Sequence, residues 1–111
     1  MTIDAPTALL RIYLGESDHV QGAPTHHRIV ELLRERGVAG ATVMRGIEGY
    51  GAKQHLHTDR ILSLSGDLPI VIEAVDREDR LRALAPELDE LLGDGLMVLL
   101  PAEVLAHRSG A

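Results

Sequence analysis

The order in which strand-like and helix-like patterns follow each other constrains the fold of this chain more than any other feature. Four segments resemble β-strands in their alternating or continuous apolar residues, and two segments repeat apolar residues with helical spacing. The predicted strands are residues 8–14, 40–47, 67–75 and 96–101. The resulting order, β-α-β-β-α-β, predicts a ferredoxin-like sandwich of the α+β class. In this fold two helices cover one face of a four-stranded antiparallel sheet, and the expected strand order is 4-1-3-2.

The first predicted helix lies between the first two strands. It follows Pro24, a residue that fits a first helical turn, and it carries an apolar stripe from Ile29 to Leu33. Gly37 is expected to stop it, because glycine readily takes the left-handed conformation that ends helices.

The second predicted helix begins near two aspartates and contains a proline. Asp76 is expected to cap the helix, Asp79 places negative charge in its first turn, and leucines keep helical register through residue 92. Pro86 is expected to kink or interrupt it, since proline removes an internal donor. A short extra strand is expected at residues 103–107.

One face of the predicted sheet lacks a cover. Strands 8–14 and 67–75 each offer one fully apolar face, and the helices should pack on these two faces. No other segment is expected to cover the opposite face, so we predict that this face forms a subunit interface. The central strands contribute to it Arg11, Tyr13, Val71, Glu73 and Val75.

Composition limits the functions that the chain can have. Its 111 residues predict a single domain, residues 8–107, with flexible termini at 1–7 and 108–111. A net charge of −6, with two tyrosines and no Phe or Trp, argues against nucleic-acid binding. No apolar run is long enough to insert in a membrane, and there is no cysteine, so a cytoplasmic protein is expected.

The stretch MRGIEGYGAKQHLHT, residues 44–58, is the most unusual part of the sequence. It matches neither the dinucleotide-binding nor the Walker pattern, and the loop that it starts, residues 46–66, is longer than a hairpin needs. One interpretation is a bend at the end of a strand. The other is a loop that binds an anion through its backbone and through basic residues. The glycines are Gly46, Gly49 and Gly51, and the basic residues are Arg45, Lys53 and Arg60.

The same stretch offers an alternative function as a metal site. His55 and His57 would share one face of an extended segment and could be two ligands, although no third ligand is evident. Catalytic residues are not expected: Ser63 lacks a nucleophile elbow, and Glu16 with Asp18 fits a solvated turn. We therefore expect a protein that is not an enzyme and needs no cofactor.

Four pieces of the sequence, in their order and spacing, resemble the PII-like family catalogued as domain of unknown function 190. The likeness covers about residues 8 to 106 and extends more widely to the PII signal-transduction proteins. PII proteins share the Gly-aromatic-Gly of Gly49-Tyr50-Gly51 and the turn Gly93-Asp94-Gly95. The four pieces are IYLGE (12–16), AGATVMRGIEGYG (39–51), HT (57–58) and DLPIVIEAVD (67–76).

The resemblance implies a signalling protein that is a homotrimer with its sheets packed inward. It implies a small anionic ligand, or a nucleotide, between subunits, and a 46–66 loop that docks on a transporter or an enzyme. The implied ligand-binding residues are Arg45, Gly46, Gly49, Tyr50, Gly51, Lys53 and Arg60, with Gly93, Asp94 and Gly95. The chain departs from the PII pattern at Leu96, where PII proteins have a Lys that binds phosphate. The ligand could therefore be smaller or less charged than ATP, or it could be a different nucleotide.

Overall fold

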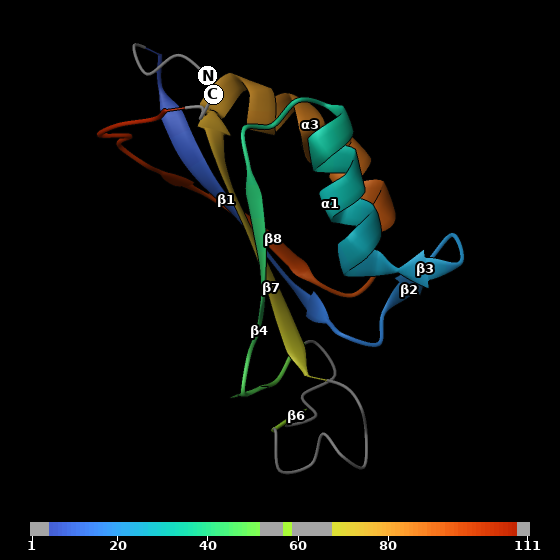
Figure 1. Ribbon diagram of the computed structural model, residues 1–111. Coiled ribbons are helices and arrows are strands. Elements are labelled where there is room, and N and C mark those ends of the chain that lie inside the picture. Colours follow the sequence, from blue (N-terminus) through green and yellow to red (C-terminus); the bar gives the residue numbers. More distant parts are fainter. Residues whose placement is uncertain (1–4, 52–56, 59–67, 109–111) are drawn as a thin grey trace.

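The chain folds into one antiparallel sheet with two helices on one of its faces (Figure 1). The computed structural model describes residues 5–51, 57–58 and 68–108, and for 57–58 the backbone alone. The sheet has the order β4-β7-β1-β8, which confirms the predicted ferredoxin-like topology. Its elements are β1 (Thr7–Gly15), α1 (Thr25–Glu35), β4 (Ala41–Arg45), β7 (Pro69–Arg77), α3 (Glu78–Leu91) and β8 (Leu96–Pro101).

Two short hairpin-like pairs lie outside this sheet. The pair β2 (His19–Val20) and β3 (Ala23–Pro24) precedes α1, and the pair β5 (Glu48–Gly49) and β6 (His57–Thr58) follows β4. In the described part of the chain, neither helix is both long and apolar enough to span a bilayer.

The core lies between the helices and one face of the two central strands. Strand side chains alternate between the two faces of a sheet, so every second residue of β1 and β7 points toward the helices. Ile12 lies opposite Ile72 in the β1–β7 register, and both are almost fully buried. Leu81 and Leu88 of α3 and Ile29 of α1 complete the centre of this layer. The periodicity of the sequence therefore identified the correct inner faces.

Helix α1 ends as its sequence predicts. Gly37 has a φ of 76°, the left-handed conformation that costs glycine little. The Val38 N–H donates to the Leu33 carbonyl over 3.0 Å, and the Gly37 N–H donates to the Arg34 carbonyl over 3.1 Å. This pair of bonds is a Schellman motif, which satisfies carbonyls that the helix leaves open.

Helix α3 differs from its prediction in two ways. It continues through Pro86 to Leu91 without interruption. Asp76 does not cap it: the carboxylate is fully buried at the end of β7, where it accepts hydrogen bonds from the Ala39 N–H at 3.0 Å and the Arg77 N–H at 2.7 Å. Asp79 lies in the first turn, as expected. Asp76 therefore ties the connection between α1 and β4 to the end of β7.

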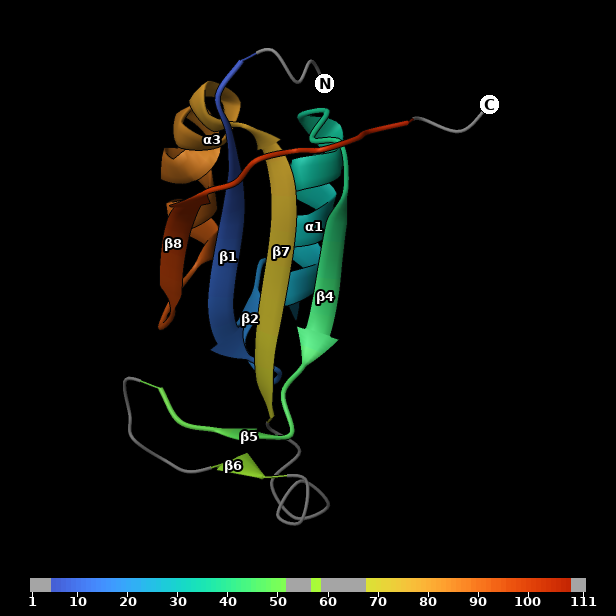
Figure 2. The same ribbon diagram turned by 90° about the vertical axis from the view of Figure 1, so that its left-hand side faces the viewer.

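The sheet face opposite the helices is turned toward the viewer in Figure 2. Its side chains are mostly apolar and surround a central ion pair. The Arg11 guanidinium lies 2.7 Å from the Glu73 carboxylate. The pKa of Arg11 is raised, mainly by its hydrogen bond with Glu73 and to a smaller extent by its hydrogen bond with Tyr13. We call this surface the open face. By strand register, its residues are Leu9, Arg11, Tyr13, Thr42, Met44, Val71, Glu73, Val75, Leu96, Val98 and Leu100.

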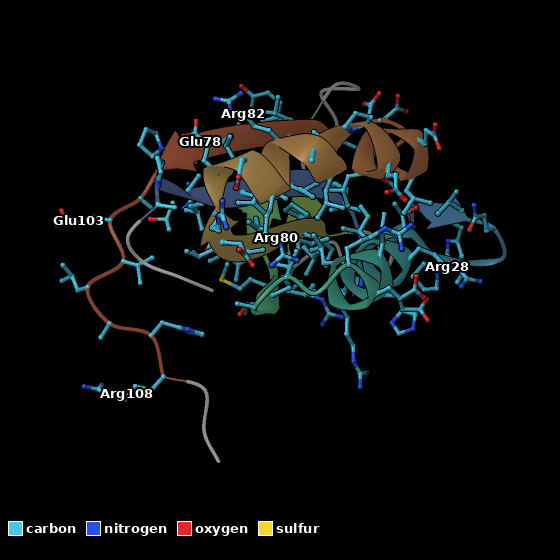
Figure 3. All side chains as sticks on the ribbon, turned by 90° about the horizontal axis from the view of Figure 1, so that it is seen from above. Arg28, Glu78, Arg80, Arg82, Glu103 and Arg108 are labelled. Carbon is cyan, nitrogen blue, oxygen red and sulfur yellow. The ribbon has the colours of Figure 1, made fainter. Side chains whose placement is uncertain are left out.

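A C-terminal arm, residues 102–108, crosses part of the open face, contrary to the expectation that no segment would cover it (Figure 2). The predicted strand at 103–107 is wrong, because this segment is extended but pairs with no strand. The arm is anchored by the Ala102 N–H, which donates to the Thr7 carbonyl over 3.1 Å. It encloses a groove of about 350 Å³ against one end of the sheet. Glu103 and Arg108 mark its course away from the helices in Figure 3.

The two helices are linked on their outer side by charged groups. Arg36 after α1 donates to Glu87 of α3 over 2.7 Å, and Arg80 of α3 donates to the Arg36 carbonyl over 2.6 Å. Arg80 lies between the two helices in Figure 3. The hydrogen bond from Arg36 is the main reason that the pKa of Glu87 is lowered from its ordinary value of 4.5.

The Arg36–Glu87 pair gives an expected pH dependence. Because the pKa of Glu87 is lower in the folded chain than in the unfolded chain, its contribution is present above about pH 4.5 and is lost as the pH falls through the folded value. Glu87→Gln should therefore lose less stability than the wild type between pH 6 and pH 3 in urea unfolding. Since both side chains are exposed, the difference should be small, and equal acid slopes in the two proteins would contradict this assignment.

Candidate ligand site

Among the described residues, Arg45, Gly46 and Gly49 of the predicted ligand site lie together at one end of the sheet. Strand β4 ends at Arg45 and β7 begins at Pro69, and Arg45 lies opposite Ile70 in the register of these two strands. Strand β1 ends at the same end of the sheet, and its residue Leu14 also lies opposite Ile70. We call this end of the sheet, with β5 beside it, the ligand corner. The strands β4 and β7 extend beyond α1 there (Figure 1).

Two of the three glycines at the ligand corner allow the backbone to approach a proline ring closely. A Cβ placed on Gly46 would lie 2.9 Å from Cγ of Pro69, and one on Gly49 would lie 3.2 Å from the same atom. The Gly46 N–H donates to the Pro69 carbonyl over 2.7 Å. Gly51 has no such neighbour, since a Cβ there meets nothing within 4 Å. The first two glycines therefore serve close packing at the end of β4.

Arg45 does not extend alone into solvent. Its guanidinium forms an ion pair with the Glu16 carboxylate, and the side chains of Arg45 and Glu16 are 58% and 20% exposed. Sequence reasoning placed Glu16 in a solvated turn and missed this partner. Asp18 does fit the turn, because its carboxylate accepts a hydrogen bond from the Gly15 N–H over 3.1 Å.

The second predicted half of the site, the turn Gly93-Asp94-Gly95, lies at the other edge of the sheet. A Cβ on Gly95 would lie 2.6 Å from the Tyr13 carbonyl oxygen. Any side chain at this position would therefore clash with the backbone of β1. Gly93 has open space around it. Leu96, which follows the turn, pairs with Tyr13 in the β1–β8 register and is 56% exposed.

The two halves do not meet within one chain. Strands β4 and β8 are the outer strands of the sheet, with β7 and β1 between them. Three strand spacings separate them, about 14 Å. The backbones of Arg45 and of Gly93-Asp94-Gly95 are therefore well separated within one chain.

Several predicted site residues lie outside the described part of the chain. These are Lys53, His55 and Arg60, so the basic residues of the loop and the histidine pair stay predictions. His57 lies in β6, where its backbone is described. Tyr50 is described and is 70% exposed. Among the described residues, no three His, Cys, Asp or Glu side chains come together as a metal site would need.

The sequence comparisons identify relatives of this chain. A family model for DUF190, with the description "Uncharacterized ACR, COG1993", matches residues 7–104. A UPF0166 protein of Methanocaldococcus jannaschii is 37% identical over 97 residues, covering 86% of this chain and 89% of the relative. A UPF0166 protein of Aquifex aeolicus is 35% identical over 99 residues, covering 87% and 91%.

Solved structures of PII proteins share the fold. The Arabidopsis thaliana PII protein bound to citrate aligns with a TM-score of 0.60 at 14% identity, covering 89% of this chain and 79% of that one. CPII of Thiomonas intermedia, bound to ADP and bicarbonate, aligns with a TM-score of 0.58 at 23% identity, covering 89% and 88%. At these identities the likeness concerns the fold. With the family match over residues 7–104, it shows that the chain belongs to the DUF190 family and has a PII-like fold.

Proposed function

We propose that this protein is a PII-like regulator that acts as a homotrimer, binds a small anionic ligand between subunits, and catalyses no reaction. In this proposal residues 8–107 form one ligand-binding domain, and the 46–66 loop reports the bound state to a transporter or an enzyme in the cytoplasm.

The observation that carries the proposal is the position of the two half-sites at opposite edges of one sheet. The ligand corner lies beside β4, and Gly93-Asp94-Gly95 lies beside β8. A cyclic assembly can bring the β4 edge of one subunit beside the β8 edge of the next, and so complete each site between two chains.

The open face supports the same assembly. Tyr13 and Met44 are 39% and 40% exposed there, and the Arg11–Glu73 pair lies between apolar neighbours. Burying such a surface between subunits removes apolar side chains from water. The ion pair is already formed within each chain, so it can enter the interface without leaving an unpaired charge.

The solved relatives of the fold suggest which ligands to try. Their bound molecules are citrate in one case and ADP with bicarbonate in the other, and all of them are anions. Arg45 is a cationic group suited to such ligands, whereas Leu96 gives the opposite half-site an apolar side chain. Small anions such as these are therefore the first candidates for this chain.

Light scattering and thermal shift together test the proposal. We expect a mass of about 36 kDa, three times 12.0 kDa, and stabilisation by at least one of ADP, citrate and bicarbonate. A ligand at a hundred times its dissociation constant should add about 2.7 kcal/mol. Val71→Glu, which places a charge in the middle of the open face, should give a monomer that no longer responds to the ligand.

The matched control is Ala83→Glu, an equivalent charge on an exposed position of α3. It should leave both the mass and the response unchanged. A wild-type monomer at micromolar concentration would contradict the trimer. A trimer that none of the three anions stabilises would contradict the ligand class.

A further inference from the structure

At the ligand corner, one side-chain contact joins two strands that are not neighbours. Strands β1 and β4 lie on opposite sides of β7, two strand spacings or about 10 Å apart. Arg45 is the last residue of β4, and Glu16 follows the end of β1. Their long side chains meet across the start of β7 and form the Glu16–Arg45 ion pair.

The backbone on either side of this pair is fixed to β7. The Glu16 N–H donates to the Leu68 carbonyl over 2.9 Å, and the Gly46 N–H donates to the Pro69 carbonyl over 2.7 Å. The ion pair therefore links the end of β1 to the end of β4 across the start of β7. On each side of it, one backbone hydrogen bond attaches the chain to Leu68 or Pro69. Gly46 is the next residue after Arg45, so its bond to Pro69 is the backbone hydrogen bond nearest to the ion pair on the β4 side.

The two charged groups differ in their access to solvent. The Arg45 side chain is 58% exposed, so a dissolved anion can reach it, whereas Glu16 is 20% exposed. The guanidinium that such an anion would meet already holds a carboxylate. Its Nη2 donates to Glu16, so an oxyanion that takes this donor must displace the Glu16 carboxylate.

We propose, on the basis of the function proposed above, that Glu16 is a self-inhibiting group of the ligand site. Its carboxylate occupies Arg45 in the free protein, and an oxyanion of the ligand, either a carboxylate or a phosphate, replaces it. The replacement breaks the link between β1 and β4 and loosens Gly46 from Pro69. The segment from Gly46 to Gly49, which packs on the Pro69 ring, then changes its position when ligand binds.

The first test needs no ligand. Glu16→Gln removes the charge and keeps the size of the side chain, and it should make the Gly46 amide exchange hydrogen several-fold faster, as measured by NMR. Glu90→Gln removes an equal charge from an exposed position of α3, outside the ligand corner, and should leave the Gly46 amide unchanged. The Ile72 amide in the middle of β7 should be unaffected in both, which shows that the fold is intact. Unchanged Gly46 exchange in Glu16→Gln would overturn the proposal.

The second test titrates two probes, inorganic phosphate and citrate, at constant ionic strength. An exposed or partly exposed ion pair is worth up to about fivefold in an equilibrium, so Glu16→Gln should bind at least one probe about fivefold more tightly than the wild type. Glu90→Gln should bind it like the wild type, and Arg45→Gln should lose it. Preference for citrate would assign a carboxylate ligand, and preference for phosphate would assign a phosphorylated one.

The outcomes separate this inference from the function on which it rests. Equal affinity of the wild type and Glu16→Gln would overturn self-inhibition and leave the ligand-binding function standing. Binding of neither probe to any variant would also overturn it. In that case the trimer mass and the response to ADP still decide the proposed function independently.

Discussion

Replacing Asp76 by alanine is expected to destabilise the folded chain by about 3 kcal/mol. The carboxylate is fully buried, accepts hydrogen bonds from the backbone N–H groups of Ala39 and Arg77, and lies 3.7 Å from the Arg80 guanidinium. A hydrogen bond to a charged group contributes about 1.5–3 kcal/mol, and the substitution removes two of them. Urea unfolding at one fixed protein concentration would measure the change, because assembly makes apparent stability depend on concentration.

Asp79→Ala provides the matched control for this substitution. Asp79 lies three residues later, and its exposed carboxylate pairs with Arg77 at the surface. It should cost less than about 1 kcal/mol. Similar losses in the two variants would mean that Asp76 contributes only charge near the start of α3, and not a buried connection between α1 and β7.

Gly95→Ala is expected to cost about 2 kcal/mol or more. The added Cβ would lie 2.6 Å from the backbone oxygen of Tyr13 and 2.6 Å from Cδ1 of Leu92. The leucine can turn away, but the Tyr13 carbonyl belongs to a central strand and cannot. The start of β8 would therefore have to move away from β1, and overpacking of this kind costs about 1–3 kcal/mol.

Gly93→Ala tests the same turn without the clash. A Cβ on Gly93 meets nothing within 4 Å, so the substitution should be neutral, or stabilising by about 0.5 kcal/mol because it restricts the unfolded chain. Ligand titrations of the Gly93 variant would then report on binding alone. A loss of stability as large as that of Gly95→Ala would show that steric fit is not the reason for Gly95.

Most of the fold follows from the sequence because its signals are local. The alternation in residues 8–14 predicted a strand whose actual bounds are Thr7–Gly15, and residues 96–101 form β8 as expected. The predicted strand 40–47 ends early, at Arg45. Gly46 still donates to the Pro69 carbonyl in the β4–β7 register, but Pro69 has no N–H to donate back, so the pairing stops there. Residues 103–107 also have strand-like composition, but local pattern does not tell whether an extended segment pairs with a sheet or crosses it.

The candidate site was less predictable because its contacts are distant in sequence. The aspartate before α3 has the local appearance of a cap, yet its partner Ala39 lies 37 residues away. Glu16 and Arg45 are 29 residues apart. Their meeting depends on the strand order, on the register that places Leu14 and Arg45 both opposite Ile70, and on side chains long enough to cross β7. The strand order was predicted, but the register was not.

The position of β1 has a consequence for synthesis on the ribosome. Its neighbours in the sheet, β7 and β8, both follow late in the chain, and the hydrogen bond between Thr7 and Ala102 joins residues 95 positions apart. As the chain emerges, both edges of β1 stay unpaired until β7 is made, and one edge stays unpaired until β8 is made. Such edges can pair with other chains, so nascent copies of this protein should depend on protection by chaperones until β8 is released.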